Sequence, residues 1–245
     1  MGVRIEHPQQ LIDKIQYHCD DRGEYLPAAS YALARQSYVE GVQRGVFSFC
    51  MCPGGFIVPA ATAPGEVVVN GMSPSRRDSK FANSGIVTAI ELEDMKGYEK
   101  YGPLAGLEFQ KELEQRACQM AGGTQAAPAQ KMIDFVKGRN SSTLNDTSYQ
   151  PGLSAVDLGE VLGENMASRI RDGLRGFGKN MTGYYTNEAQ IVGVETRTSS
   201  PVRIPRDKES CEHVAVKRLF PCGEGAGYAG GILSAAMDGQ KCAEN

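Results

Sequence analysis

The sequence predicts a mixed α/β fold: a β-rich first part with a helical insert, followed by a shorter C-terminal part of strand and helix. Two patterns support this class. Short apolar runs typical of strands gather between residues 45 and 90 and return after residue 190. Between these two regions, apolar residues recur at helical spacing over 103–120 and 157–175. Strands and helices therefore occur in blocks and do not alternate strictly.

The first element is predicted to be a short helix over His7–His18, because Pro8 suits a first helical turn and apolar side chains share one face of the helix. Residues 25–36 fit either an extended segment or a helix. Strands follow at four apolar segments: Gly45–Cys52, Phe56–Ala60, Glu66–Asn70 and Gly85–Ile90. The turn sequence Pro53-Gly54-Gly55 predicts that the first two form a hairpin.

The second half of the chain opens with helices. The clearest is over 103–120, a shorter one is predicted over Pro128–Lys137, and a third over 157–175. Extended segments are predicted at Gln190–Glu195, Val202–Ile204 and His213–Val216, and a final helix at Ile232–Ala243.

Composition excludes several classes of function. The net charge of -3 predicts no basic surface for nucleic acid. No apolar run approaches the ~20 residues of a membrane helix, and the first residues carry no apolar signal core. Seven scattered cysteines fit a reduced, cytoplasmic protein better than a disulfide scaffold. With only three His, none spaced to complete a zinc site, no metal is expected.

The most informative segment is the glycine-rich loop that follows Leu219-Phe220-Pro221-Cys222 and reads Gly223-Glu224-Gly225-Ala226-Gly227-Tyr228-Ala229-Gly230-Gly231-Ile232. Glycines let backbone N–H groups approach a ligand where a Cβ would clash. The helix that follows points its positive end at the same place, which suits a phosphate or an electron-rich ring edge. The bare alternative is a tight turn before a helix, without a ligand.

This segment resembles the second FAD-contacting motif of two-dinucleotide-binding flavoproteins, in which an apolar strand ends in Gly-Asp at the flavin. Glu224 stands at the acidic position. The resemblance implies that Gly223 and Glu224 contact the ribityl-phosphate part of FAD, and that the backbone of 229–232 lies near the flavin. The set of FAD-binding residues it implies is Gly223, Glu224, Gly225, Gly227, Tyr228, Ala229, Gly230, Gly231 and Ile232.

The wider sequence is similar to the C-terminal part of bacterial FAD-dependent oxidoreductases, the NAD(FAD)-utilising dehydrogenases. Phe49-Cys50-Met51-Cys52-Pro53-Gly54-Gly55-Phe56, Asn70-Gly71-Met72-Ser73 and residues 193–203 carry this similarity. The family's first phosphate loop lies upstream of the region seen here. We therefore expect a substrate or cap domain over 1–190 and the C-terminal segment of an FAD domain over 191–245. Flavin chemistry is expected of the intact protein and not of this chain alone.

Four residues are candidates for catalysis. Arg197 and Arg203 fit either clamps for flavin or an acidic substrate, or a surface pair that holds a loop. Cys50 and Cys52 form a C-x-C pair, whose sulfurs would share one face of a regular strand. They fit buried apolar thiols better than redox partners.

The leading hypothesis is the substrate domain and C-terminal FAD-contacting part of a flavin-dependent oxidoreductase. Its partners would be FAD and an unidentified small molecule, with NAD(P)H as a further candidate. One alternative is a non-enzymatic truncated domain that binds a ligand or a partner. A second is a thiol-based reductase that uses Cys50 and Cys52. Substrate and oligomeric state are not specified by the sequence.

Overall fold

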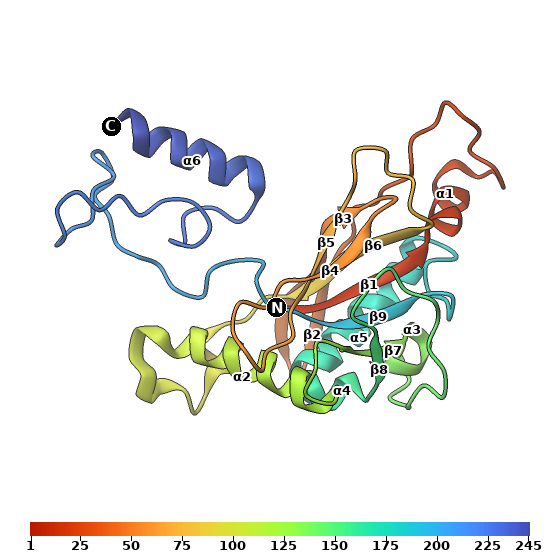
Figure 1. The fold of residues 1–245 in the computed structure, drawn as a ribbon. Coiled ribbons are helices and arrows are strands. Elements are labelled where there is room, and N and C mark those ends of the chain that lie inside the picture. The colour runs from red at the N-terminus through yellow and green to blue at the C-terminus, as the bar shows by residue number, and fades with distance from the viewer. The chain divides into compact units, whose positions relative to one another are not determined.

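The computed structural model describes residues 1–245, which fold as two compact units. The sheet unit comprises Met1–Ile90 and Glu112–Glu195, and the C-terminal unit comprises Glu91–Lys111 and Thr196–Asn245. Strands and helices occur together, so the mixed α/β class predicted from the sequence is confirmed (Figure 1).

The sheet unit is built on a seven-stranded sheet in the order β2-β3-β6-β1-β9-β7-β8. Neighbouring strands are antiparallel except β7 and β8, which are parallel. The strands are β1 (Gly2–Pro8), β2 (Ala34–Val39), β3 (Val42–Cys52), β6 (Phe81–Thr88), β7 (Ala127–Lys131), β8 (Leu153–Ala155) and β9 (Gln190–Glu195).

The central strand β1 was not foreseen. The predicted helix over His7–His18 is wrong at its start, because His7 and Pro8 still belong to β1 and the helix α1 (Gln9–Tyr17) begins after them. β1 lies between β6 and β9 and is buried from Gly2 to His7. One face of β1 carries the charged residues Arg4 and Glu6. Because charged residues are not expected in a buried strand, the sequence pattern did not indicate a strand here.

The predicted hairpin after β3 is also wrong. The turn at Pro53-Gly54 forms, but β4 (Phe56–Pro59) pairs with β5 (Val69–Met72) in a separate two-stranded sheet. In β3, β6 pairs with one edge as far as Cys52 and β2 pairs with the other edge at Val42–Phe47, so β4 is not a neighbour of β3 in the sheet. The strand predicted at Glu66–Asn70 starts later, as β5, and the one predicted at Gly85–Ile90 starts earlier, as β6.

The helices follow the predictions in part. The long helix α2 (Ala105–Met120) agrees with the pattern over 103–120. The helix predicted over Pro128–Lys137 is wrong in its first half, which is the buried strand β7, and only α3 (Met132–Val136) is helical. The pattern over 157–175 is two helices, α4 (Leu158–Leu162) and α5 (Glu164–Asn180). They are separated at Gly163, whose φ of 80° is left-handed.

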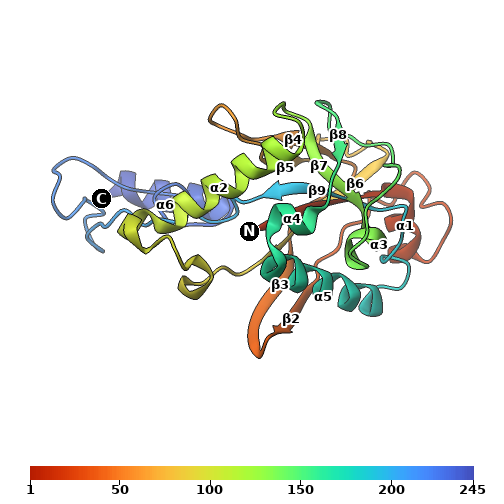
Figure 2. The ribbon, with the colours of Figure 1, turned by 90° about the horizontal axis from the view of Figure 1, so that it is seen from below.

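The two faces of the sheet are covered differently. α5 packs against β2, β3 and β6, and it contacts α3 and α4, next to which it lies in Figure 2. Val46 on this face of the sheet approaches Gly173 of α5. The small β4–β5 sheet covers the opposite face, where Gly71 of β5 lies against the guanidinium of Arg4. A polar layer therefore lies between the two sheets, beside an otherwise apolar core.

The C-terminal unit contains the short 3₁₀ helices η1 (Leu92–Met95) and η2 (Glu99–Leu104), the first part of α2, and the helix α6 (Ile232–Glu244). The final helix is confirmed. The extended segments predicted at Val202–Ile204 and His213–Val216 are not strands, and one isolated bridge joins Arg206 to His213. No neighbouring strand is present to hydrogen-bond these segments.

Candidate functional site

The most densely hydrogen-bonded side chain between the two sheets is Arg4. It is completely buried, and its Nη1 donates to both carboxylate oxygens of Glu195 at 2.8 and 2.7 Å. Its Nε donates to Asn83 Oδ1 at 2.8 Å, and Nη1 also donates to Asn70 Oδ1 at 3.3 Å. β1, β5, β6 and β9 thus bring one residue each to a single polar cluster, which we call the Arg4 cluster.

Two glycines make room for this cluster. A Cβ on Gly71 would lie 2.2 Å from Arg4 Nη2, and a Cβ on Gly85 would lie 2.9 Å from a carboxylate oxygen of Glu195. Both distances are below any real contact, so only glycine allows the charged groups to pack at these positions. The notable glycine of Asn70-Gly71-Met72-Ser73 is therefore explained by packing against Arg4.

Burial and pairing act in opposite directions on the ionisable groups of the cluster. Burial raises the pKa of the Glu195 carboxyl to about 7, although the charge of Arg4 favours its ionised form. Burial alone would lower the pKa of Arg4, but Glu195 and the nearby thiols of Cys52 and Cys50 raise it. Arg4 is therefore a fixed positive charge in the interior.

The candidate cysteines lie at the edge of this cluster. Arg4 Nη2 donates to the carbonyl oxygen of Cys50 and approaches Cys52 Sγ at 3.6 Å. β3 is not regular here: Phe49 pairs with Gly85 but Cys52 pairs with Asn83, so β3 has one extra residue. Cys50 has a left-handed φ of 46° in this bulge. As a result Cys50 is exposed and Cys52 is buried, in contrast to the regular alternation expected from the sequence.

The glycine loop is held by residues that the sequence did not single out. Asp238 of α6 accepts a hydrogen bond from the Gly223 N–H at 2.9 Å and forms a two-point ion pair with Arg206 at 2.9 and 2.6 Å. Arg206 also donates to the carbonyl oxygen of Pro221 at 2.7 Å. Arg206 and the Gly223 N–H hold the pKa of Asp238 at about 2. The acid that fixes the loop is therefore Asp238 and not Glu224.

Glu224 itself is exposed, and no residue of the chain engages its carboxylate. Its backbone carbonyl accepts from the Gly227 N–H at 2.9 Å and closes the turn. Gly227 needs its lack of a side chain for packing, because a Cβ would lie 2.7 Å from the carbonyl oxygen of Val202. A Cβ on Gly225 would meet nothing within 4 Å, so this part of the loop faces open space.

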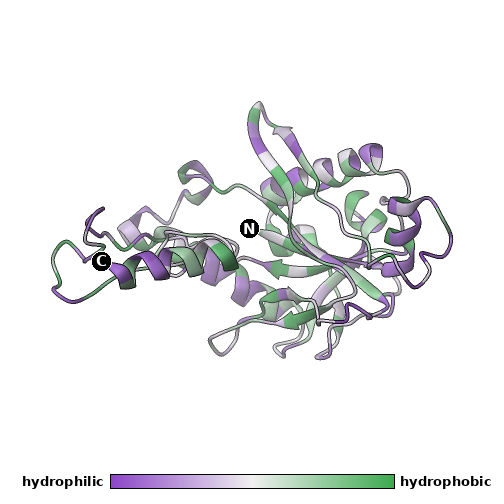
Figure 3. Ribbon diagram, turned by 90° about the horizontal axis from the view of Figure 1, so that it is seen from above, coloured by the Kyte–Doolittle hydropathy of each residue, from purple (hydrophilic) through white to green (hydrophobic).

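The start of α6 is also open. Gly231 is its N-cap and supplies no side-chain hydrogen bond, so the first N–H groups of a 13-residue helix have no capping side chain. Three large apolar residues near this end are exposed: Ile232, Leu233 and Met237. Figure 3 shows the change along α6 from apolar residues near its start to polar ones near the C-terminus.

Tyr228 lies between two guanidinium groups. Arg203 is 4.3 Å and Arg206 is 3.7 Å from the centre of its ring, and its hydroxyl donates to the carbonyl oxygen of Ile204 at 3.0 Å. Arg203 is exposed, and Arg197 is half-buried just after β9. Arg197 and Arg203 belong to the C-terminal unit together with the glycine loop, whereas Cys50 and Cys52 belong to the sheet unit.

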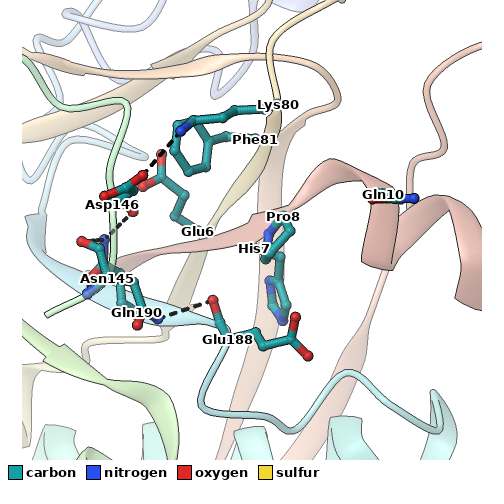
Figure 4. Close-up of a pocket in the computed structure, with 10 residues that line it drawn as sticks. All are labelled: Glu6, His7, Pro8, Gln10, Lys80, Phe81, Asn145, Asp146, Glu188 and Gln190. Atoms are coloured by element: carbon teal, nitrogen blue, oxygen red, sulfur yellow. Dashed lines mark hydrogen bonds and ion pairs between the residues drawn. The ribbon is translucent and has the colours of Figure 1, made fainter.

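The sheet unit also has a cavity of about 410 Å³. Figure 4 shows that Glu6 and His7 leave β1 in opposite directions at its wall. The Ser148 hydroxyl donates to the buried carboxylate of Glu6, and Lys80 pairs with Asp146 at 3.1 Å across the rim. Burial raises the pKa of Glu6, although hydrogen bonds from Ser148 and Thr147 favour its ionised form.

Comparison with known sequences identifies the family. Residues 1–198 match the family described as "FAD-dependent protein, C-terminal domain-like". The chain belongs to this family. The match of the FAD-dependent C-terminal domain ends just after β9, so it contains the whole sheet unit. An uncharacterized protein of Clostridium beijerinckii is 46% identical over 247 residues. That alignment covers 100% of this chain and 45% of the relative, so the chain spans less than half of the relative's length.

Sequence reasoning missed the charged residues that organise this FAD-dependent C-terminal domain. Arg4 and Glu6 stand out only once β1 is known to be a central strand, because charged residues are rare at such positions. Glu195 was predicted as the end of an extended segment and lies in the 193–203 stretch that carries the family resemblance, but it was not assigned a role. The structure brings Arg4, Glu195 and the two cysteines together, and it separates them into a different unit from the glycine loop.

No helix of the chain is both long and apolar enough to cross a membrane. No group of three or more His, Cys, Asp or Glu side chains is arranged to hold a metal ion.

Proposed function

We propose that this chain is the substrate domain and the C-terminal FAD-contacting part of a flavin-dependent oxidoreductase. The family description supports the relation to FAD, and the 45% coverage of the relative leaves room there for the first dinucleotide-binding motif. Bound flavin would supply transfer of a hydride or an electron pair to or from a small molecule. NAD(P)H is the electron donor we propose to test first.

One observation carries this proposal: the glycine loop is fixed without using Glu224. Asp238 and Arg206 hold the loop in place, and Tyr228 packs against Arg206. The carboxylate of Glu224 and the open side of Gly225 are therefore available to a ligand.

The residues present fit the polar part of FAD. A carboxylate accepts hydrogen bonds from sugar-alcohol hydroxyls, and uncapped N–H groups at a helix start bind phosphate or an electron-rich ring edge. The Glu224 carboxylate would accept a hydrogen bond from a ribityl hydroxyl. The backbone N–H groups of Gly230, Gly231 and Ile232 would donate hydrogen bonds to phosphate or flavin. Leu233 and Met237, which are exposed, would be covered by the remainder of the FAD domain.

The arginines after β9 would act on the negative charge of the substrate or of the reduced cofactor. The guanidinium of Arg203 lies over the ring of Tyr228, 4.3 Å from its centre, and Arg203 remains exposed. Arg197 is nearer to the sheet unit in sequence and is half-buried. We assign both as clamps, and we place the small-molecule substrate in the sheet unit, whose cavity at Glu6 has the size typical of ligand sites.

The test uses the longer protein that contains this chain, purified without added flavin. We expect bound flavin in the visible absorption spectrum, and we expect Glu224→Gln to lose flavin on dilution while Glu209→Gln retains it. Glu209 is an exposed acid of the same unit and is the matched control. A colourless longer protein that also fails to take up added FAD would favour the alternative of a non-enzymatic binding domain. Equal flavin retention by both variants would show that Glu224 is misassigned.

A further inference from the structure

The two thiols next to Arg4 differ in their exposure to solvent, and this difference suits thiol–disulfide exchange. Cys50 is exposed and Cys52 is buried, and the Cys52 thiol donates to the backbone carbonyl oxygen of Cys50 at 3.3 Å. Cys52 also approaches Arg4 Nη2 at 3.6 Å, so a permanent positive charge lies beside the pair. An accessible thiol, a buried partner thiol and a cation are the three features of a thiol–disulfide exchange site.

The backbone makes a bond between the two sulfurs possible. A disulfide needs Cα atoms within about 7 Å of each other, and residues two apart on a regular strand are separated by about that distance. The bulge at Cys50, with its left-handed φ of 46°, removes the regular extension of β3 at this point. The carbonyl of Cys50 is held by Arg4, so the bulge has a defined conformation.

We propose that Cys50 and Cys52 form a reversible dithiol–disulfide site that reacts with low-molecular-weight disulfides. The thiolate of Cys50 attacks one sulfur of the external disulfide, which breaks the S–S bond and releases one thiolate that takes up a proton. Cys52 then loses its proton and attacks the Cys50 sulfur, which releases the second small thiol and forms the Cys50–Cys52 disulfide. The protein loses two electrons and two protons, and the external disulfide gains both.

The electrostatics assign the two roles. The hydrogen bond with Cys50 and then burial raise the pKa of Cys52, while Arg4 opposes this shift. Cys52 therefore keeps its proton and donates to the carbonyl oxygen of Cys50 at 3.3 Å, so it is not the thiol that attacks first. Since Cys50 is also the exposed member, it attacks and Cys52 resolves. This site needs no flavin, so its test is independent of the function proposed above.

The chain contains its own controls. Cys222 is exposed, and its thiol makes no hydrogen bond within the chain. Cys211 and Cys242 hydrogen-bond to each other, and Arg206 lies 3.0 Å from Cys242 Sγ, but both thiols are buried. Cys222 is therefore a control for an exposed thiol that has no partner thiol. Cys211 and Cys242 are a control for paired thiols that are not exposed.

The experiment treats the folded full chain with oxidised glutathione, blocks the remaining thiols with a maleimide after acid quenching, and digests the protein with trypsin. Cleavage after Arg44 and Arg76 gives the peptide Gly45–Arg76, which holds Cys50 and Cys52 and no other cysteine. We expect this peptide to lose the mass of two hydrogen atoms and to carry neither glutathione nor maleimide. Reduced glutathione in excess should restore two blockable thiols.

Variants separate the two steps. Cys52→Ser should trap glutathione on Cys50, and Cys50→Ser should leave Cys52 unmodified until the protein is unfolded. Cys222→Ser should change nothing in the Gly45–Arg76 peptide. A wild-type peptide that carries glutathione on Cys50 without an internal disulfide would overturn the proposal, as would a peptide in which both thiols stay reduced. Because the decisive mass is measured on the wild-type chain, the result does not depend on whether a variant folds.

Discussion

Arg4 of β1 and Glu195 of β9 form a two-point ion pair inside the sheet unit, with 0% and 3% of their side chains exposed. Four neighbours accommodate this pair: Asn83 and Asn70 accept hydrogen bonds from the guanidinium, and Gly71 and Gly85 leave room for the charged groups. Since an unpaired buried charge is costly, the pair ties four strands to one arrangement.

Replacing Glu195 should therefore destabilise the sheet unit strongly. Glu195→Gln leaves the charge of Arg4 without its counter-ion, and we expect a loss of about 3–5 kcal/mol in the free energy of unfolding. Asp146→Asn, which breaks the exposed pair with Lys80, should cost less than about 1 kcal/mol. Urea denaturation followed by circular dichroism measures both. Similar losses for the two variants would show that the buried pair has no special role.

The space that Gly71 leaves beside Arg4 should contribute to the stability of the sheet unit, as the charge of Glu195 does. Gly71→Ala places a methyl group against Arg4 and Asn83, and we expect a loss of about 1–3 kcal/mol. Gly45→Ala is the matched control, because a Cβ there meets nothing within 4 Å and the residue also lies in a strand. We expect Gly45→Ala to leave the thermal midpoint nearly unchanged. An equal fall in both midpoints would contradict the packing argument.

His7 should make the protein sensitive to acid. Burial lowers the pKa of His7 to about 4, against 6.5 for an unperturbed imidazole, although its hydrogen bond to the Tyr184 carbonyl opposes the shift. The unfolded chain thus binds a proton more readily than the folded one. The stability from the neutral ring is complete above about pH 6.5 and is lost as pH falls through about 4, by up to about 3 kcal/mol.

The measurement compares urea midpoints at pH 8, 6.5, 5 and 4 for three proteins. His7→Gln lacks the titrating group, so its midpoint should fall less between pH 6.5 and 4 than that of the wild type. His18→Gln, at an exposed position, should follow the wild type. Parallel curves for wild type and His7→Gln would show that the buried imidazole does not titrate in this range.

The glycine loop should depend on Asp238. Asp238→Asn removes the charge that pairs with Arg206 and weakens the acceptor of the Gly223 N–H, which costs about 1.5–3 kcal/mol locally. We expect faster amide hydrogen exchange over residues 221–231 in this variant. Glu244→Gln changes an exposed acid on the same helix and should leave exchange in the loop unaltered. Unchanged exchange in Asp238→Asn would mean that Arg206 holds the loop without its partner.

Part of this description was available from the sequence. The periodic helices α2, α5 and α6 and the apolar strands β3, β6 and β9 have local patterns strong enough to be read directly. β1 and β7 could not be read in the same way. Arg4 and Glu6 interrupt the apolar pattern of β1. Pro128 and its apolar neighbours resemble the start of a helix in the sequence, and only the pairing of this segment with β8 and β9 shows that it is a strand.

The sequence by itself determined the mixed class of the fold, the glycine turn before a final helix, and the resemblance to FAD-dependent proteins, because each depends on residues that are neighbours along the chain. Only the tertiary structure decided which acid holds which partner. Arg4 is 191 positions from Glu195, and Asp238, not the nearer Glu224, fixes the glycine loop. Such pairings follow from strand order and helix packing, which bury charged groups that are far apart in the sequence next to each other. The local sequence around each residue does not indicate which distant residue will be its partner.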